Sequence, residues 1–308
     1  MQIAPRPFDL LHFAHEALRN GLAGAFVTLV GYEGAASRGV GSQMVVLTDG
    51  RHLGSLSAGC VERAVIDEAR AVARSGETRT VRYGAGSPYL DLRLPCGGGI
   101  DLQFTPLPAP ERIEAALAQL EARTTATLLL GERPCRYPPP LRIVALGHGE
   151  DLVALTRTAR GLDLAIEAYA PADDLHRDDT IHPLLHRNSL PRVAGDPWTA
   201  VVLAFHDRDW EEHLLAQALE IEAFYHGAVG SRRTQRARVA ALREAGVDRD
   251  RVDRLRGPIG LIPGARDAAT LALSIVAEVV QEYHLRARPI LAHPSGTGTS
   301  SASESAGA

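Results

Sequence analysis

The strongest constraint on the fold is a change of pattern at residue 141, after which apolar runs alternate with helical segments. The runs expected to be buried strands cover 141–146, 164–169 and 200–205. Strands that alternate with helices in this way form a parallel sheet with helices on its faces. We therefore expect a Rossmann-like α/β domain over 141–288. Its expected helices cover 151–160, 210–220, 234–245 and 268–283.

The residues before this domain favour a mixed α+β domain over 1–133. A helical pattern covers 8–19, and another runs from Val61 to Ser75. The segment Thr48-Asp49-Gly50-Arg51 has the composition of a tight hairpin turn. The strands expected in this domain cover 25–30, 42–47, 52–56, 79–83 and 100–104.

Two further segments are expected to lie outside the folded domains. Residues 134–140 contain four prolines and are expected to form a semi-rigid linker. Residues 289–308 are rich in serine and glycine and cannot bury a core, so we expect a disordered tail there.

Composition excludes several classes of function. All 33 basic residues are arginine, which excludes a Schiff-base lysine and the phosphate-binding lysine of a Walker motif. The net charge of -4 gives no electrostatic reason to expect nucleic-acid binding. Three cysteines are an odd and sparse set, so a disulfide scaffold is not expected.

The chain has neither the charged start and apolar core of a signal peptide nor an apolar run near the roughly 20 residues of a membrane span. We therefore expect a cytoplasmic protein with no membrane partner.

Two glycine-rich turns that carry cysteines are the main candidate site. Cys60 closes the stretch 54–60 just before an expected helix, where exposed N–H groups and the helix dipole favour the thiolate. Cys96 precedes three glycines, which let a ligand approach closely. We expect both thiols to face one site; the alternative is two small buried hydrophobic residues. Glu62 can orient a ligand amine or act as a partner of the helix dipole. The candidate residues are Gly59, Cys60, Glu62, Cys96, Gly97 and Gly98.

A third candidate is the turn Gly147-His148-Gly149 between an expected strand and helix. The third position of the dinucleotide fingerprint is Leu152 rather than glycine. The next strand is expected to end at Tyr169, and Ala168 offers no partner for a ribose hydroxyl. NAD(P) is therefore not expected as the ligand. A phosphate or a pterin phosphate needs only the backbone N–H groups of Gly147 and Gly149.

A fourth candidate, Gly230-Ser231-Arg232-Arg233, opens an expected helix and combines backbone donors, a hydroxyl and two guanidinium groups. These groups make an anion cradle, and the alternative is a helix start with solvated arginines. A further glycine loop over 257–264 is expected at the same edge of the sheet. His148 and His206 are isolated and are interpreted as structural or solvated rather than as ligands. Cys135 is interpreted as incidental.

Several of these segments, in the same order, resemble the XdhC/CoxI accessory proteins. The resemblance covers nearly the whole chain up to Tyr283, with two departures. The family keeps an acidic residue after its second Rossmann strand, and it reads Gly-Leu-Asp-Ile-Gly where this chain has Gly260-Leu261-Ile262-Pro263-Gly264. The similar segments are Gly24 to Val30, Met44, 48–50, 54–62, 95–98, 227–234, 258–261 and 272–278.

The resemblance implies a maturation factor rather than a classical enzyme. It implies a homo-oligomer, here expected as a homodimer, that binds the molybdenum cofactor, protects it during sulfuration and helps insert it into a xanthine dehydrogenase-type hydroxylase. A cysteine desulfurase is the expected sulfur donor. Cys60 and Cys96 are then expected to bind molybdenum or relay sulfur, because thiolate matches a soft, sulfur-rich ligand. Two alternatives stay open: an NAD(P)-dependent oxidoreductase, and an interaction scaffold without cofactor.

Overall fold

The structure is a computed structural model, and it describes residues 6–34, 36–56, 61–87, 97–177, 180–205 and 208–287. The described residues form two compact units. The N-terminal unit comprises residues 9–117 and 127–137. The Rossmann unit comprises residues 138–287 with the short segments 6–8 and 118–126. The tail expected over 289–308 lies outside the described residues.

An antiparallel sheet forms the centre of the N-terminal unit, in the order β3-β2-β1-β5-β4. Apolar side chains alternate along the central strands, so one face of the sheet is apolar and packs against helix α2 (Glu62–Ser75). The hairpin predicted over 48–51 joins β2 to β3. The strands are β1 (Gly24–Glu33), β2 (Gln43–Leu47), β3 (His52–Leu53), β4 (Arg79–Gly84) and β5 (Gly99–Pro106). Two other helices, α1 (Pro7–Arg19) and α3 (Pro110–Glu121), precede β1 and follow β5 in the chain.

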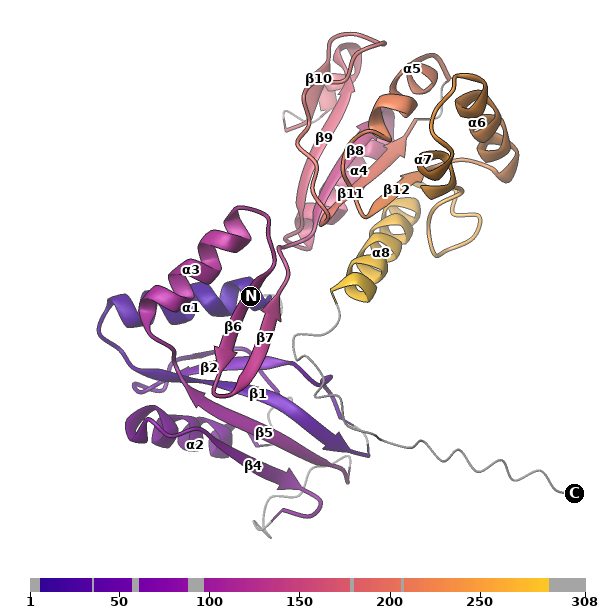
Figure 1. Cartoon of the computed structure of the whole chain (residues 1–308). Coiled ribbons are helices and arrows are strands. Elements are labelled where there is room, and N and C mark those ends of the chain that lie inside the picture. The colour runs from indigo at the N-terminus through magenta and orange to yellow at the C-terminus, as the bar shows by residue number, and fades with distance from the viewer. Residues whose placement is uncertain are drawn as a thin grey trace, which may run out of the picture. The chain divides into compact units, whose positions relative to one another are not determined.

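The opposite face of this sheet carries buried polar side chains under a two-stranded hairpin of β6 (Ala126–Leu130) and β7 (Arg133–Tyr137) (Figure 1). Tyr137 donates a hydrogen bond of 2.9 Å to Gln43, and Gln103 donates one of 2.9 Å to the carbonyl of Leu130. The prediction of a linker over 134–140 is therefore wrong for its first four residues. Pro134 is accommodated because it lies exposed in a two-stranded ribbon, where a missing N–H can be tolerated.

The Rossmann unit contains a six-stranded parallel sheet in the order β10-β9-β8-β11-β12-β13. The first strand of the unit lies in the middle, and the chain moves first to one side of it and then to the other. This is the strand order of the dinucleotide-binding fold, and it confirms the predicted fold class. The strands are β8 (Arg142–Gly147), β9 (Ala165–Pro171), β10 (His182–Leu184), β11 (Thr199–Ala204), β12 (Tyr225–Ala228) and β13 (Leu255–Arg256).

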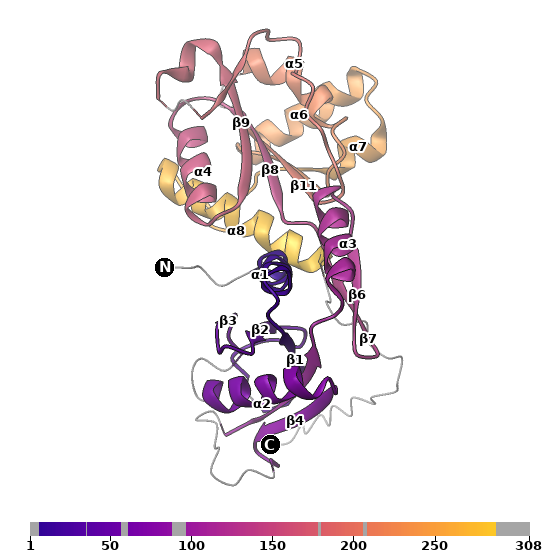
Figure 2. The same cartoon turned by 90° about the vertical axis from the view of Figure 1, so that its left-hand side faces the viewer.

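Helices cover both faces of the parallel sheet (Figures 1 and 2). One face buries Ile143, Ala145 and their neighbours against α4 and α8, while the other buries Val144 and Leu146 against α5, α6 and α7. Buried runs in β8 and β11 are apolar on both faces, which is why the sequence identified them as strands. The helices are α4 (Gly149–Gly161), α5 (Arg208–Ala218), α6 (Arg232–Glu244), α7 (Arg249–Arg254) and α8 (Ala268–Arg286), with a short 3-10 helix η1 (Ala172–Arg177).

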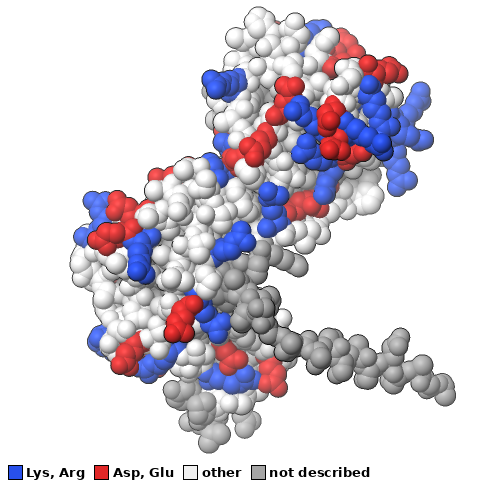
Figure 3. Space-filling model, in the orientation of Figure 1, with Lys and Arg blue, Asp and Glu red and all other residues white. Residues whose placement is uncertain are grey.

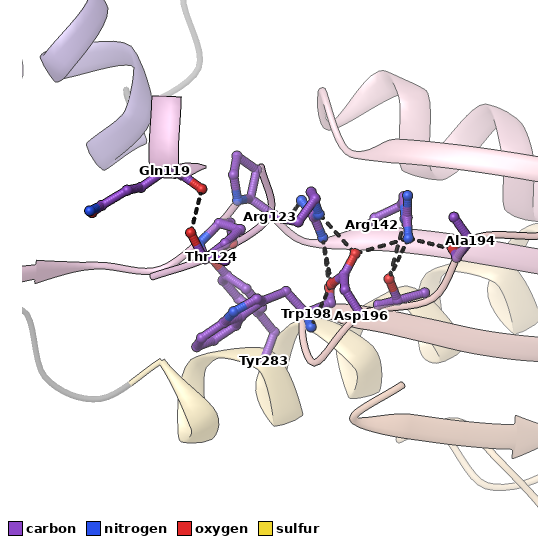
Figure 4. A network of polar contacts seen from close by, with 11 residues as sticks. Gln119, Arg123, Thr124, Arg142, Ala194, Asp196, Trp198 and Tyr283 are labelled. Atoms are coloured by element: carbon purple, nitrogen blue, oxygen red, sulfur yellow. Dashed lines mark hydrogen bonds and ion pairs between the residues drawn. The ribbon is translucent and has the colours of Figure 1, made fainter. Parts of the chain in front are cut away.

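A buried ion-pair network holds the segment 118–126 against the rest of the Rossmann unit (Figure 4). Asp196 accepts two hydrogen bonds from Arg123, of 2.9 and 3.1 Å, and one of 2.9 Å from Arg142. The backbone N–H of Trp198 donates a fourth, of 2.7 Å. The Asp196 side chain is only 11% exposed, so these donors replace water almost entirely.

Candidate functional site

The register of the N-terminal sheet directs both cysteine segments toward one end of it. Gly99, the first residue of β5, pairs with Glu33 at the end of β1 and with Gly84 at the end of β4. The segment that carries Cys96 therefore begins and ends at this end of the sheet. Strand β3 is antiparallel to β2, which is antiparallel to β1, so the chain leaving Leu53 toward Cys60 runs toward the same end.

The described residues on either side of Cys60 are tied together. Ser55 donates a hydrogen bond to the carboxylate of Glu62 in the first turn of α2. Gly54 has φ +100°, and a Cβ there would lie 2.8 Å from the carbonyl oxygen of Gln43. A glycine at 54 thus lets the chain pass tightly over β2, and the Ser55–Glu62 bond closes the loop that precedes the helix.

Arg82 fixes the described end of the second cysteine segment. Its guanidinium donates to both oxygens of Asp101 at 3.2 and 3.0 Å and to the carbonyl of Ala85 at 2.7 Å, and it forms an ion pair with Glu33. The amide of Ala85 also donates to the carbonyl of Gly98 at 3.0 Å. Gly97 has φ +70°, and no atom of the described residues lies within 4 Å of a Cβ built on it.

Gly59, Cys60 and Cys96 lie outside the described residues, so the prediction of one shared thiol site stays a prediction. The third cysteine is described. Cys135 is 1% exposed in β7, and burial raises the pKa of its thiol to about 11. Gln43 donates a weak hydrogen bond to its sulfur at 3.8 Å. Such a thiol stays protonated and unreactive near neutral pH.

The glycine turn of the Rossmann unit lies where the strand order reverses, between β8 and β11. A Cβ on Gly147 would lie 2.6 Å from the carbonyl oxygen of Ala204, so only glycine lets these two strand ends approach. Gly149 has φ +67° and is the first residue of α4. Its N–H is not open, because it donates a hydrogen bond of 3.1 Å to the carboxylate of Asp174.

Asp174 corrects the interpretation of the second Rossmann strand. The prediction ended this strand at Tyr169, with Ala168 at the position for a ribose-binding acid and Glu167 one position off, on the opposite face of the strand. Strand β9 instead continues to Pro171, and η1 then brings Asp174 back to the first turn of α4. Its Oδ2 also lies 3.7 Å from Nδ1 of His148. The chain therefore has an acidic residue after its second Rossmann strand. The alanine at position 168 alone no longer argues against NAD binding.

The turn between β12 and α6 carries the second predicted anion cradle. Ser231 is the N-cap of α6 and accepts a hydrogen bond of 3.1 Å from the N–H of Thr234. Arg232 and Arg233 are exposed, and among the described residues no hydrogen bond or ion pair holds either guanidinium group. Because all strands of this sheet are parallel, this turn and Gly147 lie at the same edge of the sheet.

The glycine loop over 257–264 is held by helix α8. Ser274 accepts a hydrogen bond of 2.7 Å from the N–H of Ile262, and Glu278 accepts one from the N–H of Gly260. Glu278 also accepts a hydrogen bond of 2.8 Å from the hydroxyl of Tyr225. Burial, and then the charge of Glu278, raise the pKa of Tyr225, so this hydroxyl remains a donor. Ser274 and Glu278 thus support the loop from beneath.

Two family descriptions match the chain: the XdhC Rossmann domain over residues 143–279, and the XdhC and CoxI family over residues 17–84. The molybdenum cofactor insertion chaperone PaoD of Escherichia coli (strain K12) is 39% identical to this chain over 292 residues. That similarity covers 88% of this chain and 86% of PaoD. The chain belongs to the XdhC and CoxI family.

Two other proteins are similar to this chain. The uncharacterized protein YqeB of the same organism is 26% identical over 277 residues, which cover 83% of this chain and 43% of YqeB. A crystal structure described as a xanthine dehydrogenase from Bacillus halodurans superposes with a TM-score of 0.67 at 21% identity. It covers 92% of this chain and 97% of that one, and it shows that the fold is shared.

Sequence reasoning missed several residues that shape this XdhC and CoxI family member. Ser274 and Glu278 could have been found, because they lie four residues apart and are the two polar residues of the otherwise apolar stretch 271–280. Asp174 would have emerged from extending β9 by two residues. Among the described residues no cluster of three or more metal-binding side chains occurs, and no described helix is long and apolar enough to cross a membrane.

Proposed function

We propose that this chain binds the molybdenum cofactor and assists its sulfuration and its insertion into a xanthine dehydrogenase-type hydroxylase. The observation that carries this proposal is the similarity to PaoD, which extends over both units. Such a cofactor has a sulfur-rich metal end and a phosphorylated pterin end. The N-terminal unit carries thiols, which match the chemistry of the first, and the Rossmann unit, taken by itself, carries backbone N–H groups with arginines that suit a phosphate.

The cysteine end of the N-terminal sheet is the proposed site for molybdenum and sulfur. Support comes from the strand register, which directs the segments with Cys60 and Cys96 toward one end, and from Gly97, which no other described residue crowds. Cys60 comes two residues before the first residue of α2, where the dipole stabilises a thiolate. Glycines at 59, 97 and 98 would let the cofactor approach the backbone. Glu62 accepts a hydrogen bond from Ser55, so we assign it a role in shaping the loop that precedes α2.

The same thiolate can receive sulfur. A Cys60 thiolate that attacks the terminal sulfur of a desulfurase persulfide would become a persulfide and release the desulfurase thiolate. Sulfur would then lie next to the bound cofactor. We accordingly propose a cysteine desulfurase and a molybdenum hydroxylase as partners, and a homodimer as the functional assembly.

Metal and pterin analysis of the anaerobically purified chain tests this function. We expect molybdenum and pterin in the wild-type protein and a loss of more than about tenfold in Cys60→Ser and in Cys96→Ser. Cys135→Ser is the matched control, because its thiol is buried and should leave cofactor content unchanged. Wild-type protein free of pterin under these conditions, or equal content in all three variants, would contradict the proposal.

A second measurement addresses sulfuration and insertion. Incubation with a cysteine desulfurase and cysteine should add the mass of one sulfur atom to the peptide with Cys60, and Cys60→Ser should abolish this addition. Wild-type chain loaded with cofactor should activate an apo-hydroxylase faster than free cofactor does. Co-purification of NAD in place of pterin would favour the oxidoreductase instead.

A further inference from the structure

Helix α6 begins with a concentration of positive charge that no described acidic residue balances. No acidic residue lies in its first turn, where Arg232 and Arg233 add two guanidinium groups to the positive end of the helix dipole. Arginine side chains gather over α6 and α7 in Figure 3. Some of those farther along are paired with a carboxylate, as Arg243 is with Asp253 at 3.4 Å. Among the described residues, Arg232 and Arg233 at the start of α6 therefore have no acidic partner of the kind that Arg243 has near its end.

A buried arginine lies directly beneath this turn. Arg238 is 5% exposed, and its Nε lies 2.6 Å from the carboxylate of Glu211 while Nη2 donates to the carbonyl of Val229 at 2.6 Å. Its Nη1 is buried and has no hydrogen-bond acceptor among the described residues. Nη1 points to Gly230: a Cβ at that position would lie 3.2 Å from it. A buried N–H without an acceptor is costly, so this donor is suited to an acceptor that the described residues do not supply.

The other helix start at this edge is already occupied. The N–H of Gly149 donates to Asp174, so a phosphate at the start of α4 would have to displace a carboxylate and lie beside its negative charge. At the start of α6, Glu211 is the only carboxylate that the described residues place on Arg238. It neutralises this one arginine, and no described carboxylate pairs with Arg232 or Arg233. An anion is therefore repelled at one turn and attracted at the other.

We infer that the β12–α6 turn, and not the Gly147–Gly149 turn, binds the phosphate or pyrophosphate group of the ligand, with Arg238 as a donor beneath Gly230. This assignment rests on the proposed function only in taking that ligand to be a phosphorylated pterin. Arg232 and Arg233 contact the anion from the solvent side, and the backbone N–H groups of the first turn complete the cradle. Asp174 then acts as a specificity residue that excludes an anion from the first glycine turn.

Titration calorimetry of the full chain with inorganic pyrophosphate tests the assignment. We expect Arg232→Ala/Arg233→Ala to weaken binding by roughly ten- to a hundredfold, because two charge-assisted contacts are lost. Arg243→Ala removes a charge from the same helix and should change the affinity less than about twofold. Wild-type protein that does not bind pyrophosphate, or a double variant that binds like wild type, would overturn the inference.

Two further variants separate the competing turns. Asp174→Asn should leave pyrophosphate affinity within about twofold, whereas a rise of tenfold or more would place the anion at Gly149 and overturn the inference. Arg238→Met/Glu211→Met removes the buried pair together, which leaves no unpaired buried charge. It should fold, as circular dichroism can check, and bind several-fold more weakly; unchanged affinity would remove Arg238 from the site. Pterin content is measured separately, so failure of pyrophosphate binding alone contradicts only this assignment.

Discussion

Asp196→Asn is the substitution whose effect the structure defines most sharply. The carboxylate accepts hydrogen bonds from Arg123, Arg142 and the N–H of Trp198, and it is the only anion that Figure 4 shows between the two guanidinium groups. Asparagine keeps the shape and one oxygen but removes the charge. It also turns an NH₂ group toward groups that can only donate hydrogen bonds.

The expected loss follows from burial. The side chains of Arg123 and Arg142 are only 24% and 17% exposed, so water can replace the carboxylate only in part. Removing one partner of a buried ion pair costs about 3–5 kcal/mol, and the retained oxygen places this variant near the lower figure. With a slope of about 1–3 kcal/mol/M, a loss of about 3 kcal/mol lowers the urea midpoint by roughly 1–3 M.

Tryptophan fluorescence is a suitable assay, because both tryptophans, Trp198 and Trp210, belong to the Rossmann unit. Asp253→Asn is the matched control. Its carboxylate also meets two arginines, at 3.4 and 3.5 Å, but is 50% exposed, so its loss should cost less than about 1 kcal/mol. Equal losses in the two variants would refute the argument from burial.

The same carboxylate makes the stability of this unit depend on pH. Burial alone would raise the pKa of Asp196, but hydrogen bonds from Arg123 and from the N–H of Trp198 outweigh it and lower the pKa. Its contribution is therefore complete above the unfolded pKa of about 3.9 and is lost as the pH falls through the folded value. Asp196→Asn should flatten this part of the pH profile of the urea midpoint. A variant whose profile stays parallel to that of wild type would contradict the assignment.

Three further outcomes can be checked on the purified chain. Iodoacetamide should label Cys60 in the folded protein at pH 7.5, whereas Cys135, with a pKa of about 11, should react only after unfolding, as mass spectrometry of quenched samples would show. Gly54→Ala should destabilise the N-terminal unit by at least about 2 kcal/mol in thermal melts, because the new Cβ meets backbone at a φ of +100°. Ser274→Ala should cost about 1–2 kcal/mol and speed amide hydrogen exchange at Ile262, whereas exchange at the wild-type rate would show that another group accepts this N–H.

The parts of the fold that the sequence could predict are those set by local pattern. Strands β8 and β11 are continuous apolar runs buried on both faces, and helix α2 shows its apolar positions at helical spacing. The hairpin of β6 and β7 was missed for the opposite reason. Its contacts join residues 92 and 94 positions apart, as between Gln43 and both Cys135 and Tyr137, and prolines beside it suggested a linker. No local pattern contains such pairings.

Asp174 and Arg238 illustrate why the candidate site could be predicted only in part. Both turns were identified from glycines, which mark where backbone can accept a ligand. Whether the N–H groups at such a turn are available depends on side chains from elsewhere: Asp174 reaches Gly149 from 25 residues away, and Glu211 reaches Arg238 from another helix. Glycine spacing therefore locates a possible anion site, and only the tertiary structure shows which site is already filled.

The residues that carry the family resemblance fall into two groups once their contacts are known. Gly54, Ser274 and Glu278 each have a structural role, since they permit a tight crossing or hold the loop at 257–264, and these roles need no ligand. Arg232 and Arg233 have no such role among the described residues, and they lie at a helix end where their charge is unfavourable without an anion.

A substitution that removes an unfavourable charge should stabilise the protein in the absence of ligand. Arg232→Ala/Arg233→Ala should therefore unfold at the same or a higher urea concentration than wild type, while it binds pyrophosphate more weakly. Loss of stability together with loss of binding would instead make these arginines part of the scaffold.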